Sequence, residues 1–148
     1  MTNINPTRYF RNIKGSFNKF LGTSFPNTSF NFQDSEFTTG NINSWVQIDY
    51  LNRYADVKSL IIVQLTFFAK NDRYAVKAEE LCDEVLNRLL VQEGRDGLQS
   101  IPVRDWFNTG NPVIGALILK PKLINKPVID QYGITNISTT IELRFVRL

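Results

Sequence analysis

The sequence predicts an α+β fold, in which a mostly antiparallel sheet of about five strands is packed by an N-terminal helix and a central amphipathic helix. Three observations predict this class. Two segments carry apolar residues at helical spacing, several others alternate between apolar and polar residues, and their order along the chain is helix, strands, helix, strands. No repeat or linker interrupts the 148 residues, so we expect residues 1–148 to form a single domain.

The first segment has the features of a helix that begins near Pro6 and ends at Gly22. Asn5 can cap it, and proline suits the first helical position because an N–H would have no helical partner there. One face is an apolar stripe, and the opposite face is basic, with no acid before Asp34. The stripe consists of Tyr9, Phe10, Ile13, Phe17, Phe20 and Leu21, and the basic face of Arg8, Arg11, Lys14 and Lys19.

Residues 23–44 show no sustained period and are rich in Asn, Ser, Thr and Phe, so we interpret them as a long loop with room for a short strand. Its phenylalanines indicate that it docks on another surface, because disordered segments are poor in aromatic residues. Five segments after it read as strands: residues 45–51, 59–69, 97–106, 112–122 and 134–148. The connection between the first two is short, which favours antiparallel pairing.

The central helix is predicted from Asp72 to about Gln92. Asn71 or Asp72 can cap it, and Gly94 lies just past its end. Its apolar stripe can cover the wholly apolar face of the preceding strand, which is formed by Ile61, Val63, Leu65, Phe67 and Ala69. Four acids, Glu79, Glu80, Asp83 and Glu84, are expected on the solvent side rather than in a metal or acid–base site.

The composition excludes several classes of function. The chain has no histidine and one cysteine, so it has no His-based general base, no Ser-His-Asp or Cys-His arrangement and no His- or Cys-rich zinc site. No intramolecular disulfide can form, and Cys82 reads as a small buried apolar residue. No signal peptide or membrane span is evident, and the net charge is only +3. We expect no cofactor, no metal, no membrane contact and no enzymatic activity.

Two features of the surface leave alternatives. The basic helix face lies beside aromatic residues, which is compatible with a small basic nucleic-acid-binding domain, although no RRM, KH or helix-turn-helix motif is present. The segment 60–68 is apolar on both sides, yet one helix covers only one of them. The economical interpretation is a subunit that completes its burial by assembly.

Three segments in order carry a family resemblance: Trp45-Val46-Gln47-Ile48-Asp49-Tyr50, then Leu60-Ile61-Ile62-Val63-Gln64-Leu65-Thr66-Phe67-Phe68, then the helix Ala75-Val76-Lys77-Ala78-Glu79-Glu80-Leu81-Cys82-Asp83-Glu84-Val85-Leu86. In this order the chain resembles the tail terminator proteins of tailed bacteriophages, which are small α+β subunits of similar length. Residues 52–56 replace the Gly-rich hairpin that is frequent in that family, so a related neck, head-completion or tail-tube subunit stays as an alternative.

The resemblance implies a virion protein, assembled in the host cytoplasm, that forms a homohexameric ring at the head-proximal end of the tail tube. The ring would stop tube polymerisation and present a docking surface to the head connector. The implied partners are the tail-tube protein, a head-connector or neck protein and a sheath protein, with DNA only passing through the lumen. Candidate ring contacts are Tyr54, Ile62, Gln64 and Thr66. Candidate axial contacts are Phe30, Phe32, Phe37, Asn108 and Asn111, and candidate electrostatic contacts are Arg8, Arg11, Lys14 and Lys19.

Overall fold

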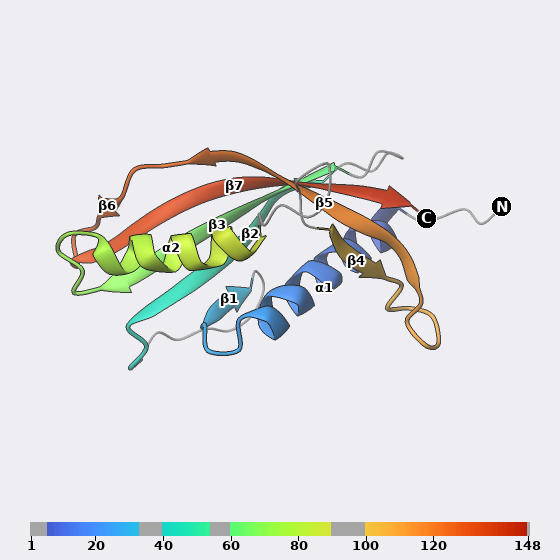
Figure 1. Ribbon diagram of the computed structural model, residues 1–148, viewed down its shortest axis with the longest axis horizontal. Coiled ribbons are helices and arrows are strands. Elements are labelled where there is room, and N and C mark those ends of the chain that lie inside the picture. Colours follow the sequence, from blue (N-terminus) through green and yellow to red (C-terminus); the bar gives the residue numbers. More distant parts are fainter. Residues whose placement is uncertain (1–5, 33–39, 54–59, 90–99, 148) are drawn as a thin grey trace.

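A curled, mostly antiparallel sheet of seven strands forms the centre of the molecule, and both helices pack against it (Figure 1). The computed structural model describes residues 6–32, 40–53, 60–89 and 100–147. The strands run in the order β1-β2-β3-β7-β5-β4, and β6 pairs with β7 beside this path. The elements are α1 (Pro6–Ser24), β1 (Phe30–Phe32), β2 (Ser44–Arg53), β3 (Leu60–Lys70), α2 (Val76–Leu89), β4 (Ser100–Arg104), β5 (Val113–Ile124), β6 (Val128–Ile129) and β7 (Ile134–Arg147).

The α+β prediction is confirmed, but the sheet has two more strands than the five expected. Both additions are short: β1 has three residues and β6 has two. The first lies inside the segment interpreted as a long loop and pairs in parallel with β2. Strands of this length carry too few residues to show an alternating pattern, so the sequence could not separate them from loops.

The core lies between the two helices and one face of the sheet. Adjacent strands place their inward residues side by side, as in the row Val46, Phe67 and Ile137 across β2, β3 and β7. These side chains and the apolar stripes of both helices form one hydrophobic cluster, so α1 and α2 cover the same face of the sheet. The apolar face predicted for β3 is confirmed, because its five residues are at most 2% exposed.

The start of α2 is fixed by Asp72, as the capping prediction required. Its carboxylate accepts hydrogen bonds from the backbone N–H groups of Lys77 (3.0 Å) and Ala78 (2.8 Å). The helix nevertheless begins at Val76 and not at Asp72, because Ala75 has a φ of 61° and interrupts the helical backbone. The predicted end near Gln92 lies outside the described residues.

The two faces of α2 match their predictions. Its inward residues are buried, and burial, with Asp83 and Glu79 nearby, raises the pKa of the Cys82 thiol to about 11. All four acids of its outer face, Glu79, Glu80, Asp83 and Glu84, are exposed. Neither described helix is long and apolar enough to span a bilayer.

Candidate assembly surfaces

The outer face of β3, predicted as a ring contact, is only partly available in the single chain. Ile62 and Gln64 are half-buried, but Thr66 is 7% exposed, so the expectation that it faces solvent is wrong. Thr66 lies mid-sheet between strands on both sides, and its hydroxyl accepts a hydrogen bond from Gln64 Nε2 (3.3 Å). Tyr54 lies outside the described residues.

A buried carboxylate lies next to Ile62 on this outer face. Glu142 of β7 is 6% exposed, and its carboxylate pairs with Lys122 (3.0 Å) and, at 3.7 Å, with Arg144. Lys120 is its cross-strand neighbour on β5. A buried charge is tolerated where it is paired, so Glu142 holds basic side chains in place around itself. Nothing in the sequence pattern indicates that Glu142 is buried.

Among the described residues, five of the eight large apolar side chains that are more than half exposed lie in residues 121–134, which we call the arm. It comprises the end of β5, strand β6 and the turn before β7, and within the described residues it pairs only with β7 (Figure 1). Its apolar side chains are each more than half exposed: Leu123, Ile124, Val128, Ile129 and Tyr132. Large apolar side chains exposed to this extent in one segment make the arm a candidate interaction surface.

The tip of the arm is an ordered turn. The Asp130 carboxylate accepts hydrogen bonds from the backbone N–H groups of Tyr132 (2.8 Å) and Ile134 (3.0 Å), and Gly133 has a φ of 76°. The sequence analysis did not identify the arm as a candidate interaction surface. The signal that could have found it is the group of large apolar residues at 128, 129 and 132 inside a Pro- and Gly-bounded turn.

The tip of the arm lies beside the segment that leads into α2. Thr135 donates a hydrogen bond to the backbone oxygen of Asp72 (2.8 Å), and Ile134 pairs with Lys70. Tyr74 (79% exposed) and Val76 (52%) therefore extend the apolar surface of the arm at the same end of the molecule.

The turn between β4 and β5, predicted as an axial contact, is held by the buried carboxylate of Asp105. That carboxylate accepts hydrogen bonds from the side-chain amides of Asn12 (3.4 Å) and Asn108 (2.6 Å) and from the Phe107 N–H (3.1 Å). Asn111 has a φ of 46°, and its backbone oxygen accepts a bond from Arg104. Asn108 and Asn111 thus have structural roles in shaping this turn, and their axial role stays a prediction.

The basic residues of α1 contact aromatic rings of the same chain. Arg11 lies 4.1 Å from the centre of the Phe107 ring, Lys14 lies 5.6 Å from that of Tyr50, and Lys19 lies 5.8 Å from that of Trp106. These cation–π contacts fix α1 against β2 and the β4–β5 turn. The Arg8 side chain is outside the described part of the structure.

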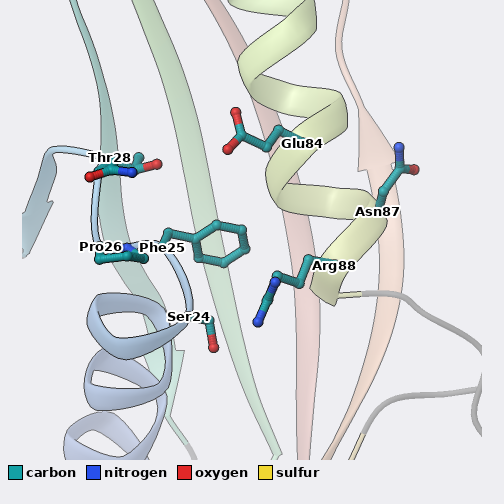
Figure 2. Close-up of a pocket in the computed structure, with 8 residues that line it drawn as sticks. Ser24, Phe25, Pro26, Thr28, Glu84, Asn87 and Arg88 are labelled. Carbon is teal, nitrogen blue, oxygen red and sulfur yellow. The ribbon is translucent and has the colours of Figure 1, made fainter.

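Two of the remaining predicted axial residues, Phe30 and Phe32, lie near a small pocket. Phe30 and Phe32 are half-buried, stack on each other at 5.7 Å and pack against the core, whereas Phe37 lies outside the described residues. The neighbouring pocket encloses 390 Å³ between the α1–β1 connection and the end of α2 (Figure 2). Glu84 and Arg88 line it together, so it has no net charge with which to select an ionic ligand.

No protein-family model matches the chain, and no curated protein matches it significantly. One solved structure aligns over 97% of this chain and 97% of its own, with 10% identity and a TM-score of 0.59. A chain of a structure titled "Virion of native gene transfer agent (GTA) particle" aligns over 95% of this chain and 92% of its own, with 8% identity and a TM-score of 0.46. The first likeness shows a shared fold over nearly the whole chain.

Proposed function

We propose that this protein is a structural subunit of a bacteriophage virion that forms a ring at the head-proximal end of the tail tube. The observation that carries the proposal is the arm, whose five large apolar side chains are each more than half exposed in the single chain. Exposed apolar surface of this extent is costly in water and is buried on association. The order of strand and helix motifs, which resembles that of tail terminators, supports the same assignment.

A ring of this kind works by geometry. Copies related by rotation contact one another through two different surfaces, and the contacts close into a ring when the rotation closes. One side of the ring complements the last ring of tube protein, and the other side does not accept a further tube subunit, so growth stops there. That second side presents a docking surface to a head-connector or neck protein, and DNA passes only through the lumen.

Two alternatives use the same surfaces differently. A neck, head-completion or tail-tube subunit would also bury the arm by assembly, but its ring would lie elsewhere in the particle. A nucleic-acid-binding domain is less well supported, because Arg11, Lys14 and Lys19 already lie over aromatic rings of their own chain.

The test is to follow both the purified protein and the particles. Light scattering coupled to gel filtration is expected to show a species of about six subunits, formed alone or on added tail tubes. Tubes assembled without this protein are expected to be over-long, and labelled protein is expected at the junction of head and tail in electron micrographs. A chain that stays monomeric with tubes present, and whose removal leaves tube length unchanged, would overturn the proposal.

A further inference from the structure

The outer surface of α2 and the far side of the sheet carry opposite net charges, because four acids outnumber the exposed cations Lys77 and Arg88 on α2. On one side, α2 covers the core and directs the four acids Glu79, Glu80, Asp83 and Glu84 away from it, all exposed. None of these carboxylates forms an ion pair within the described parts of the chain. We call this surface the acidic α2 surface.

On the other side, the exposed charged residues on the outer face of β5 and β7 are basic. Lys120, Glu142 and Ile62 form one row across β5, β7 and β3. The neighbouring row, Leu119, Leu143 and Ile61, faces the core, so the first row lies on the outer face of the sheet. The only acid in it, Glu142, is buried beneath its partners, whereas the cations reach solvent. We call this the basic sheet surface; its exposed cations are Lys120, Lys122 and Arg144, continued along the arm by Lys126.

We propose that the acidic α2 surface of one copy docks on the basic sheet surface of the next copy. The inference deepens the proposed function, on which it rests, by naming the two surfaces that meet in the ring. Because these surfaces lie on opposite sides of the sheet, the contact is heterologous and repeats from copy to copy, which is the arrangement that a closed ring needs.

The charges fix how the copies meet. Like surfaces repel, so two copies cannot associate through their α2 helices or through their basic faces, and only the front-to-back arrangement is attractive. Apolar residues lie at both surfaces and supply burial: Val76 (52% exposed) begins α2, and Leu123 (57%) lies beside the basic residues of β5. A second copy is favoured over a nucleic acid as the partner, because it satisfies the acidic surface as well as the basic one.

A charge-reversal experiment tests the pairing. The first variant is Glu80→Lys with Asp83→Lys, which makes both surfaces basic. The second is Lys120→Glu with Lys126→Glu, which makes the basic surface acidic and leaves the Lys122–Glu142 pair intact. Each variant alone is expected to associate at least about tenfold more weakly than the natural chain, because like charges then meet at every contact. An equimolar mixture is expected to recover association, since alternating copies are complementary at every contact.

The control is Arg147→Glu, which reverses an exposed charge of β7 on the opposite face of the strand from Arg144, and it is expected to associate like the natural chain. Thermal unfolding checks that each variant folds. If Lys120→Glu with Lys126→Glu does not fold, Lys120→Gln with Lys126→Gln replaces it, with weaker association and a weaker dependence of association on salt expected.

The outcomes separate this inference from the proposed function. If the natural chain forms rings and the folded reversal variants do so equally well, or if their mixture fails to recover, the pairing is wrong while the proposed function stands. If Lys120→Glu with Lys126→Glu associates normally and loses only salt-dependent binding to duplex DNA, the basic sheet surface serves a nucleic acid and the inference is overturned. If the natural chain never associates, with or without tubes, the proposed function itself has failed.

Discussion

The two halves of β5 differ in burial: the first contributes buried side chains to the core, and the second is exposed. Its first half lies between β4 and β7, with Leu117 and Leu119 fully buried. Its second half continues into the arm, where Leu123 and Ile124 are each 57% exposed. We call the first half of β5, with the β4–β5 turn, the anchored end. It is packed within the single chain, whereas the arm leaves its apolar side chains exposed, as the proposed function requires.

The anchored end is built from close contacts between α1 and the β4–β5 turn. The Asn12 side chain accepts a hydrogen bond from the Trp106 N–H (3.0 Å), and the Ser16 hydroxyl accepts one from the Trp106 indole N–H (3.2 Å). At Gly15 an added Cβ would lie 3.1 Å from the Trp106 ring, so glycine lets the indole lie directly on the helix. Within the described residues, the apolar side chains of the arm stay more than half exposed, as expected of a surface that is proposed to meet a partner.

The largest effect on stability is expected at Gly115, in the anchored half of β5. A Cβ there would lie 2.4 Å from the backbone oxygen of Val146 and 2.5 Å from the Phe145 ring, so Gly115→Ala forces the strands apart. We expect a loss of about 3 kcal/mol, the upper end of overpacking costs. Urea unfolding measures it, with Ala116→Gly as a control. An unchanged midpoint would show that β5 and β7 are not packed this closely.

A somewhat smaller loss is expected at Asp105, the centre of the anchored turn. Asp105→Ala leaves the amide groups of Asn12, Phe107 and Asn108 without their acceptor, which costs about 2 kcal/mol because the bonds are made to a charged group. Thermal unfolding measures the loss. Substitution of Asp130, which holds the exposed turn of the arm, is the matched comparison and should cost less. Equal losses of unfolding free energy at the two turns would show that the arm is held as firmly as the anchored end.

The third effect concerns Tyr50, which attaches β2 to α1. Its hydroxyl donates a hydrogen bond to Asn18 Oδ1 (2.6 Å), its ring meets Phe10 edge to face, and burial raises the pKa of the hydroxyl above its usual range. Tyr50→Phe keeps the ring and removes the donor, so we expect a loss of about 1 kcal/mol. Because the pKa is raised in the folded chain, Tyr50 should stay protonated while exposed tyrosines titrate. A spectrophotometric titration in which all tyrosines ionise together near pH 10 would contradict this placement.

Sequence patterns predicted the elements that have sustained periodicity. The alternation in β3 and β7 and the stripes of α1 and α2 are long enough to specify which residues face the core. The patterns could not reveal the contacts of Asp105, because its partner Asn12 is 93 residues away in the chain. They also assigned the α1 cations to an open face, since nothing in a helical period shows that Phe107 and Trp106 come to lie beside it.

Part of the candidate site could likewise be predicted from the sequence, and part could not. The outer face of β3 was anticipated from its mixed composition, but the burial of Thr66 depends on neighbours in two other strands. The arm was not anticipated, because the exposure of its side chains depends on how the end of β5 and strand β6 pair with β7, and that pairing appears only once the register is known.

The smallest effect on stability is expected in the arm, and it is the one that separates the two ends most sharply. Leu123→Ser with Ile129→Ser changes side chains that are 57% and 53% exposed, so the free energy of unfolding should change by no more than about 0.5 kcal/mol. Association into rings, or onto tail tubes, should nevertheless be lost, because these side chains belong to the surface that the proposed assembly buries. The control is Val113→Ser, an exposed apolar residue (40%) at the anchored end, which should affect neither property. Gel filtration with light scattering and thermal unfolding of the same samples give both measurements. Strong destabilisation of the variant would show that the arm contributes to the stability of the single chain. Normal assembly of the variant would show that the arm is not part of the interface.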